Sequence, residues 1–509
     1  MTLGPAATVG AIGAPPDQPS GPPSVASQPG GEPGRRQPNL PALGDRLDHE
    51  GRSWRFWVVA VLVGVGAGLG AGLLMAVLHA VQHLAYGYRH GDFQSGVRRA
   101  PAWRPLVVLA AGGLVLGTAW VVLRRVGGPV RGLSEAVWQK AGELPFVDTL
   151  VNGLLQIVAV GAGATLGREG APKEVGAGWA SLLCRRGRLG PAERQLLVAC
   201  GAGAGMAAVY NVPLGGALFA AEVLLGTLAL PVALPALAVA GVATAVSWLL
   251  LPDQPTYRVA PTTTDASLVL FAVVLGLVAG VLSAGLVRGV GWAKGRHPRG
   301  PLATVLAITL VFTAVGGVAS GLPEVLGNGK DVAQAALSGS LALGTVAAVL
   351  VVRPLATAAC LRSGAVGGLF TPTLTVGCLL GLLAGRGWTG LWPGPSTPAV
   401  AMVGACALLA GTMQAPLAAL VMVVELTHSG LALVVPLGLA AVAATEVSRA
   451  LIPASIYDVT LLGSQARPTG PGDPGGPQAG RSWWPPNWRR MAERTRLAKL
   501  SRSREAKRA

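Results

Sequence analysis

Two short segments place a glycine cluster ahead of a proline, and this combination is suited to binding an anion. They cover residues 161–172, which include Glu169, and residues 363–372. Glycine permits unusual backbone angles and a close approach of a ligand, and proline is favoured at the first position of a helix. The free N–H groups and the positive dipole end of a helix that begins there bind an anion without any full positive charge. The chemistry therefore favours an anion path, and no enzyme activity is expected.

The elements that must position these segments are membrane-spanning helices. Of the 509 residues, 51% are hydrophobic and 12% are charged, whereas soluble domains contain about 25% charged residues. A span needs roughly 20 predominantly apolar residues. Six long stretches carry no charge: residues 106–123, 196–221, 223–252, 266–287, 332–352 and 387–424. The composition excludes a soluble globular enzyme and predicts an all-α polytopic membrane protein. Its broken half-helices are expected to line a cavity, because irregular backbone survives at membrane depth only when it is buried or lines one.

An internal repeat divides the apolar part of the chain into two halves. Pro213 is followed nine residues later by Glu222, and Pro416 is followed nine residues later by Glu425, at an offset of 203 residues. Repeats of this size are typical of transporters, which bind their substrate near the midplane where the halves meet. We predict a first membrane repeat at 53–252, a linker at 253–265 and a second membrane repeat at 266–462.

Positive charge is concentrated at the two ends of the chain. The net charge is +17, and residues 463–509 contain 11 Lys/Arg against 3 Asp/Glu. Because Lys and Arg mark the cytoplasmic side of spans, we predict a multi-pass protein of the plasma or inner membrane with both termini cytoplasmic. Residues 1–52 are rich in Pro and Gly and are predicted to be a disordered tail. The basic, Trp-containing C-terminal tail suits anionic lipid headgroups, with a solvated tail as the alternative. No nucleic acid, metal or cofactor is expected.

Three motifs, taken in order along the chain, resemble those of the CLC family of chloride channels and transporters. Gly167-Arg168-Glu169-Gly170 is similar to the family's GREGP signature, and Gly368-Leu369-Phe370-Thr371-Pro372 is similar to its GxFxP motif. Ile456-Tyr457-Asp458 resembles its late tyrosine segment, and the two proline–glutamate blocks resemble blocks in the two family halves. The resemblance implies a CLC-type inverted-repeat helical body. It also implies a homodimer in which each subunit carries its own pore.

The resemblance also implies a role for each motif residue. Glu169 corresponds to the gating glutamate, whose carboxylate occupies the outer anion site and moves away when it is protonated or displaced. Tyr457 corresponds to the tyrosine whose hydroxyl donates to the central anion. The residues expected to bind the anion are Gly167, Arg168, Gly170, Gly368, Leu369, Phe370, Tyr457 and Arg131. Without the resemblance, a structural role for Glu169 would be as well supported as a gating role: either a salt bridge with Arg168 or a carboxylate at a helix start. Tyr457 would then be interpreted as an interfacial anchor.

Two departures from the family pattern concern the inner end of the path. The family's GSGIP motif supplies a serine to the anion, whereas this chain has Arg131 there and Ser134 three residues later. Arg131 either raises the local anion concentration or faces water. Proton-coupled members usually carry a glutamate at the position of Val223, with Glu222 one residue earlier in this chain. Glu222 is therefore either a proton relay or a structural carboxylate at a helix end, like Glu425.

The predicted function is passive conduction of chloride, or a similar small anion, through a CLC-type pore gated by Glu169. Proton/chloride antiport is the alternative. Fluoride export is a further alternative within the family, disfavoured because that branch generally lacks the tyrosine that is Tyr457 here. The predicted partners are the anion, the lipid bilayer and a second copy of the chain.

Overall fold

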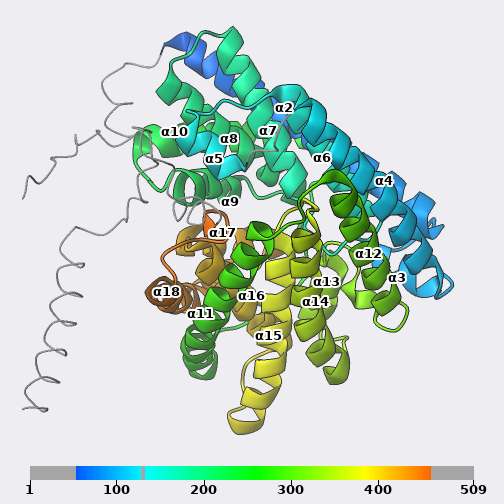
Figure 1. Ribbon diagram of the computed structural model, residues 1–509. Coiled ribbons are helices and arrows are strands. Elements are labelled where there is room, and N and C mark those ends of the chain that lie inside the picture. The colour runs from blue at the N-terminus through cyan, green and yellow to red at the C-terminus, as the bar shows by residue number, and fades with distance from the viewer. Residues whose placement is uncertain (1–52, 128–131, 460–509) are drawn as a thin grey trace, which may run out of the picture. The chain divides into compact units, whose positions relative to one another are not determined.

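Helices and the turns between them make up the described part of the chain. The computed structural model describes residues 53–127 and 132–459. Both predicted tails, 1–52 and 463–509, and Arg131 therefore lie outside the described residues (Figure 1). The first repeat contains α2 (Trp54–Tyr86), α3 (Phe93–Arg99), α4 (Arg104–Val126), α5 (Leu133–Gln139), α6 (Phe146–Gly161), α7 (Gly170–Arg186), α8 (Pro191–Tyr210), α9 (Pro213–Leu218), the π-helical η1 (Phe219–Leu224) and α10 (Leu230–Ser247).

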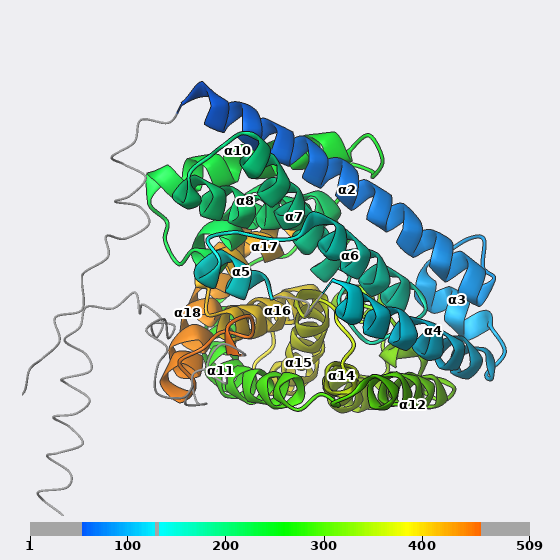
Figure 2. The same cartoon turned by 45° about the horizontal axis from the view of Figure 1, so that its top comes forward.

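The second repeat follows a helix-free segment at 248–265. It contains α11 (Ala266–Gly295), α12 (Pro301–Ala319), the 3-10 turn η2 (Pro323–Val325), α13 (Lys330–Leu337), α14 (Leu343–Ser363), α15 (Phe370–Leu391), α16 (Thr397–Met413), α17 (Pro416–Thr427), the 3-10 turn η3 (Leu431–Leu433) and α18 (Val434–Leu451). In Figure 2, α2, α8 and α10 lie in the upper part of the view, and α11, α12 and α14 lie in the lower part.

Eight of the described helices are long and apolar enough to cross a membrane: α2, α4, α10, α11, α12, α14, α15 and the segment from η3 through α18. Their outward faces carry exposed large apolar side chains such as Leu73, Val115 and Leu310. A contiguous apolar surface of this kind is suited to lipid rather than water. The prediction of an all-helical, multi-pass membrane protein is confirmed.

The two repeats meet through a reciprocal pair of contacts between helix ends. The Glu222 carboxylate accepts hydrogen bonds from the Leu417 and Ala418 amides, at 3.3 and 2.6 Å, at the start of α17. The Glu425 carboxylate, on α17, accepts from the Leu214 and Gly215 amides, at 3.0 and 2.6 Å, at the start of α9. Because each carboxylate reaches the beginning of the other segment, the two segments run antiparallel, as an inverted repeat requires.

The turns that precede these segments are also alike. Asn211 and Gln414 end α8 and α16 in the left-handed region, with φ of 57° and 56°. Non-glycine residues rarely adopt this conformation, and asparagine is among those that tolerate it best. In both repeats the turn then leads into a helix that begins with proline, where the missing N–H costs nothing.

Glycine contacts hold α7 against α8 and α15 against α16. A methyl group on Gly176 would collide with the carbonyl oxygen of Gly201, and one on Gly404 would collide with that of Gly377. Small residues let membrane helices approach closely, because packing rather than hydrophobicity drives their association. The close packing fixes α7 and α15, whose N-terminal ends build the candidate site.

Candidate anion site

A short backbone bridge brings the two glycine-rich segments together. The Gly167 amide donates to the Gly368 carbonyl at 2.7 Å, and the Gly368 amide donates to the Gly167 carbonyl at 2.9 Å. α7 begins at Gly170, and α15 begins at Phe370. The N-terminal ends of two helices from different repeats therefore converge, and their free N–H groups face a common region.

The Glu169 side chain is fully buried at this convergence. Its Oε1 accepts a hydrogen bond from the Phe370 amide at 2.6 Å. Its Oε2 accepts from the Thr371 hydroxyl at 3.0 Å and from the Tyr210 hydroxyl at 3.1 Å. An anionic group thus occupies the N-terminal end of α15, where the helix dipole favours negative charge.

The glycines around Glu169 leave room for its carboxylate. A methyl group on Gly167 or on Gly368 would overlap Oε1 of Glu169, and one on Gly170 would collide with the Gln156 side-chain oxygen and with the Gly368 amide. Leu369, the residue before α15, is buried beside them. Gly167 and Gly368 therefore border one volume, which the Glu169 carboxylate fills in this structure.

Arg168 does not pair with Glu169. Its guanidinium lies 5.0 Å from the centre of the Tyr210 ring, and Nη1 is 3.7 Å from the Met75 sulfur. Neither of the two ion pairs among residues 53–127 and 132–459 includes Arg168 or Glu169. The salt bridge between Arg168 and Glu169, which the sequence alone allowed, is therefore not formed. The buried Arg168 side chain leaves its Nε without a hydrogen-bond partner.

The centre of the Tyr457 ring lies 4.6 Å from the ammonium group of Lys173, which is on α7 one turn after Glu169. The ring also packs edge-on against Phe219 of η1, with centroids 5.4 Å apart. The Tyr457 hydroxyl is buried and has no hydrogen-bond partner. A buried hydroxyl is nearly always paired, so this one is available to an acceptor that the described part of the chain does not supply. The hydroxyl therefore does not face the surface of the described part of the chain, as that of an interfacial anchor would.

The segment around Tyr457 contacts the region predicted to form the inner gate. Burial raises the pKa of the Asp458 carboxyl, and hydrogen bonds from Ser455 and Ser134 oppose this shift. Ser134 is buried in the first turn of α5, after the exposed Gly132. The structure thus brings Ser134 beside the neighbour of Tyr457, while the prediction for Arg131 falls outside the described residues.

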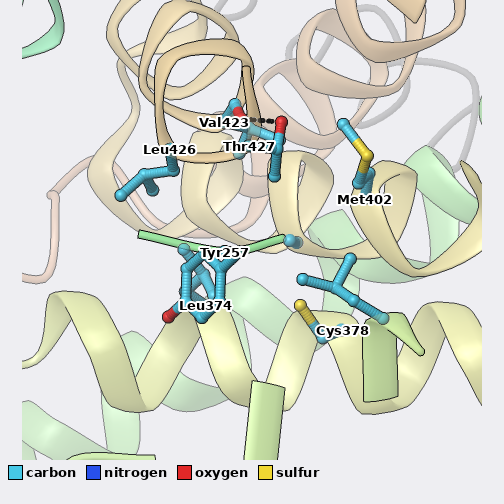
Figure 3. A pocket seen from close by; sticks show the side chains of 9 residues that line it. Tyr257, Leu374, Cys378, Met402, Val423, Leu426 and Thr427 are labelled. Atoms are coloured by element: carbon cyan, nitrogen blue, oxygen red, sulfur yellow. Dashed lines mark hydrogen bonds between the residues drawn. The ribbon is translucent and has the colours of Figure 1, made fainter. Parts of the chain in front are cut away.

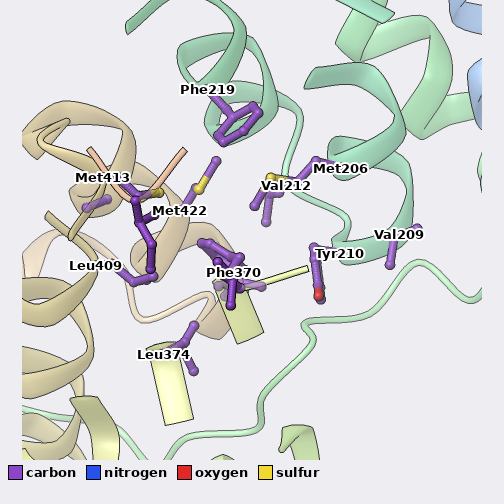
Figure 4. Close-up of a cluster of buried hydrophobic side chains, with 14 of the residues drawn as sticks. Met206, Val209, Tyr210, Val212, Phe219, Phe370, Leu374, Leu409, Met413 and Met422 are labelled. Atoms are coloured by element: carbon purple, nitrogen blue, oxygen red, sulfur yellow. The ribbon is translucent and has the colours of Figure 1, made fainter. Parts of the chain in front are cut away.

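Two residues that the sequence did not single out hold the Glu169 carboxylate. Tyr210 ends α8, and its ring lies 5.6 Å from the Phe370 ring within the buried cluster of Figure 4. Thr371 stands inside the GLFTP segment, and its hydroxyl also lies within hydrogen-bond distance of that of Tyr210; because each hydroxyl has one proton, only two of the three contacts among Tyr210, Thr371 and Glu169 are made at a time. The only signal for Thr371 was a hydroxyl in the motif, and Tyr210 gave none beyond its place before the Asn211 turn.

Removal of the Tyr210 hydroxyl is expected to release the carboxylate more easily. A hydrogen bond to a charged group contributes about 1.5–3 kcal/mol, and 1.4 kcal/mol corresponds to about tenfold in an equilibrium. Tyr210→Phe keeps the ring against Arg168 and leaves the Phe370 amide and the Thr371 hydroxyl in place, so we expect anion flux in liposomes to rise by about tenfold. Tyr88→Phe removes a hydroxyl bonded to Gln82 instead and serves as the control. Equal flux in both variants would mean that the Tyr210 hydroxyl does not hold the Glu169 carboxylate in place.

The cavity of Figure 3 is not part of this site. It lies between α15, α16 and α17 and is lined by uncharged side chains, including Leu374, Met402, Leu426 and Tyr257. None of its lining residues carries a positive charge, and none lies at the N-terminal end of a helix. It offers an anion neither a charge nor free amides.

Comparisons with known proteins agree with this geometry. Residues 112–449 match the family model described as "Voltage gated chloride channel". The chain is 32% identical over 415 residues to the voltage-gated ClC-type chloride channel ClcB of Citrobacter koseri, which covers 79% of this chain and 98% of that protein. The fold is similar to that of a slow cyanobacterial Cl⁻/H⁺ antiporter, with a TM-score of 0.71, 24% identity and coverage of 81% and 99%. It is also similar to a CLC-type fluoride/proton antiporter, with a TM-score of 0.66, 19% identity and the same coverage.

Proposed function

The chain belongs to the voltage gated chloride channel family, and on this premise we propose that it conducts chloride passively along a path gated by Glu169. The observation that carries the proposal is the buried Glu169 carboxylate, which accepts the Phe370 amide at the start of α15. A carboxylate and a chloride ion compete for the same donors, because both are monovalent anions. Relatives described as chloride channels support chloride as the substrate.

Gating follows from this competition. While Glu169 is ionised and in place, the Phe370 amide and the Tyr210 and Thr371 hydroxyls are occupied. Protonation removes the negative charge that these donors stabilise, and an incoming anion competes with the carboxylate for them. Either event leaves preorganised donors for chloride, which then exchanges its hydration shell for fixed dipoles.

Passive conduction is favoured over proton coupling by the inner part of the path. Valine cannot carry a proton, and Val223 stands where the resemblance places the glutamate that proton-coupled members usually carry. The adjacent Glu222 carboxylate is engaged by the Leu417 and Ala418 amides, which gives it a structural task. The second candidate is proton/chloride antiport with Glu222 as the relay, a candidate supported by the antiporters among the structural neighbours.

A proton measurement distinguishes the two candidates. Purified protein in liposomes is placed in a steep chloride gradient without a proton ionophore, and internal pH is followed. We expect chloride to move without sustained proton movement, because Val223 interrupts the relay. Uphill proton movement driven by chloride would establish antiport instead. The same measurement with fluoride in place of chloride tests fluoride export. Flux of fluoride without flux of chloride would establish that function.

We also propose the assembly and orientation that the family and the charge pattern imply. Each subunit of a homodimer is expected to carry its own path, and both termini are expected on the cytoplasmic side. The basic segment at 463–509 is then placed to contact anionic headgroups. These proposals rest on the resemblance and on the sequence.

A further inference from the structure

Lys173 is a buried cation close to the proposed path. It lies on α7, one turn after Glu169, and its amide donates to the Glu169 carbonyl at 3.3 Å. The side chain is only 5% exposed. Its ammonium group lies 4.6 Å from the centre of the Tyr457 ring and 5.0 Å from that of Phe219. The ammonium is thus held against the ring that carries the unpartnered hydroxyl.

The carboxylates nearest to Lys173 are engaged elsewhere. Glu169 accepts the Phe370 amide and two hydroxyls. Glu174 accepts hydrogen bonds from the side-chain amides of Asn152 at 2.6 Å and Gln156 at 2.8 Å. Within the described residues, neither ion pair includes Lys173. A buried ammonium group therefore stands without a fixed counter-ion.

A charge in this position is costly unless something compensates it. Burial of an unpaired ammonium is strongly unfavourable, and charged residues within membrane proteins characteristically mark ion pathways. The two aromatic rings supply cation–π attraction, but they leave the ammonium donors without an acceptor. The buried Tyr457 hydroxyl also lacks one. The Lys173 ammonium and the Tyr457 hydroxyl are thus two hydrogen-bond donors without an acceptor, and both lie at the Tyr457 ring.

We propose that the Lys173 ammonium, together with the Tyr457 hydroxyl, binds a permeating monovalent anion below the Glu169 site. The inference rests on the proposed function and adds a second buried cation, besides Arg168, to a path whose other donors are amides and hydroxyls. The mobile anion is then the counter-ion that residues 53–127 and 132–459 do not provide.

Chloride binding to detergent-purified protein tests the role of Lys173. Calorimetric titration of potassium chloride is carried out on Glu169→Gln, in which the side chain no longer competes as an anion, and on Glu169→Gln/Lys173→Met. We expect Lys173→Met to weaken chloride binding by at least about tenfold. Glu169→Gln/Lys173→Arg, which keeps the charge, is expected to stay within about threefold of the parent. The control is Glu169→Gln/Lys140→Gln, because Lys140 is an exposed lysine after α5. This variant is expected to bind chloride with the affinity of the Glu169→Gln parent.

Unchanged chloride affinity in Lys173→Met, accompanied by a lower Tm, would overturn the inference and leave Lys173 as a purely structural cation–π group. If Lys173→Met does not remain monodisperse, Lys173→Gln decides by the same criterion, since it retains a polar end. The outcome is separable from the proposed function. Flux in Glu169→Gln liposomes tests conduction, whereas the Lys173 comparison tests the affinity of one site in solution.

Discussion

Glu169→Gln is expected to raise chloride flux at neutral pH by about tenfold and to abolish its increase in acid. Glutamine has nearly the shape of glutamate but no charge, so it imitates the protonated gate. Three donors hold the native carboxylate: one amide and two hydroxyls. Each charge-assisted bond contributes about 1.5–3 kcal/mol, and loss of part of one such bond is sufficient for the expected change.

Chloride efflux from liposomes, recorded in neutral and acidic buffer, measures both parts of this prediction. Glu143→Gln is a matched control, because Glu143 is an exposed glutamate paired with Arg194. It should leave flux and its pH dependence unchanged. A Glu169→Gln protein that retains both the native flux and the native acid response would remove Glu169 from the gating role.

Part of the site follows from local rules. A glycine cluster followed by a proline indicates a helix start that leaves amides free. The role of Glu169 came from the resemblance to the CLC family, and not from the local sequence. The structure brings Glu169 to the Phe370 amide across 201 residues of sequence. The helix starts fall two residues before Pro172 and Pro372, since the first turn of a helix tolerates proline beyond its first position.

The side chains that complete the site were not predictable in the same way. The Tyr210 hydroxyl reaches Glu169 only because α8 packs against α7 at the Gly176–Gly201 contact. The sequence shows Lys173 directly after Pro172, but the direction of its side chain depends on the rotation of α7 toward Phe219 and Tyr457. Such details depend on tertiary packing, which periodicity and motif spacing do not specify.

Glu222 illustrates how one residue supports two interpretations until its surroundings are known. Sequence alone offered a proton relay or a structural carboxylate. In the structure it mirrors Glu425, with each carboxylate bonded to the amides that begin the opposite segment. The reciprocal bonds compensate two helix N-termini at the interface of the repeats. Whether Glu222 also carries protons is a question for the coupling measurement, which reads transport rather than structure.

Gly167→Ala is expected to lower chloride flux by at least about tenfold, because the added methyl would fill the volume that a permeating anion must enter. The atoms that a Gly167 methyl would meet first all belong to the Glu169 carboxyl group. If the carboxylate and chloride occupy one volume in turn, a methyl there obstructs both. Gly167 does not have a positive φ, so alanine adds no left-handed backbone strain at this position.

Removal of the Glu169 side chain separates the two effects of the methyl. In Glu169→Ala the colliding carboxylate is gone, so any further loss of flux in Gly167→Ala/Glu169→Ala reflects obstruction of the anion itself. We expect the double variant to remain at least about tenfold below Glu169→Ala in liposome efflux. Gly285→Ala, where a methyl meets only open space, controls for a glycine substitution in a membrane helix. Equal flux in Glu169→Ala and the double variant would mean that Gly167 accommodates the gate alone, and that chloride passes through a different volume.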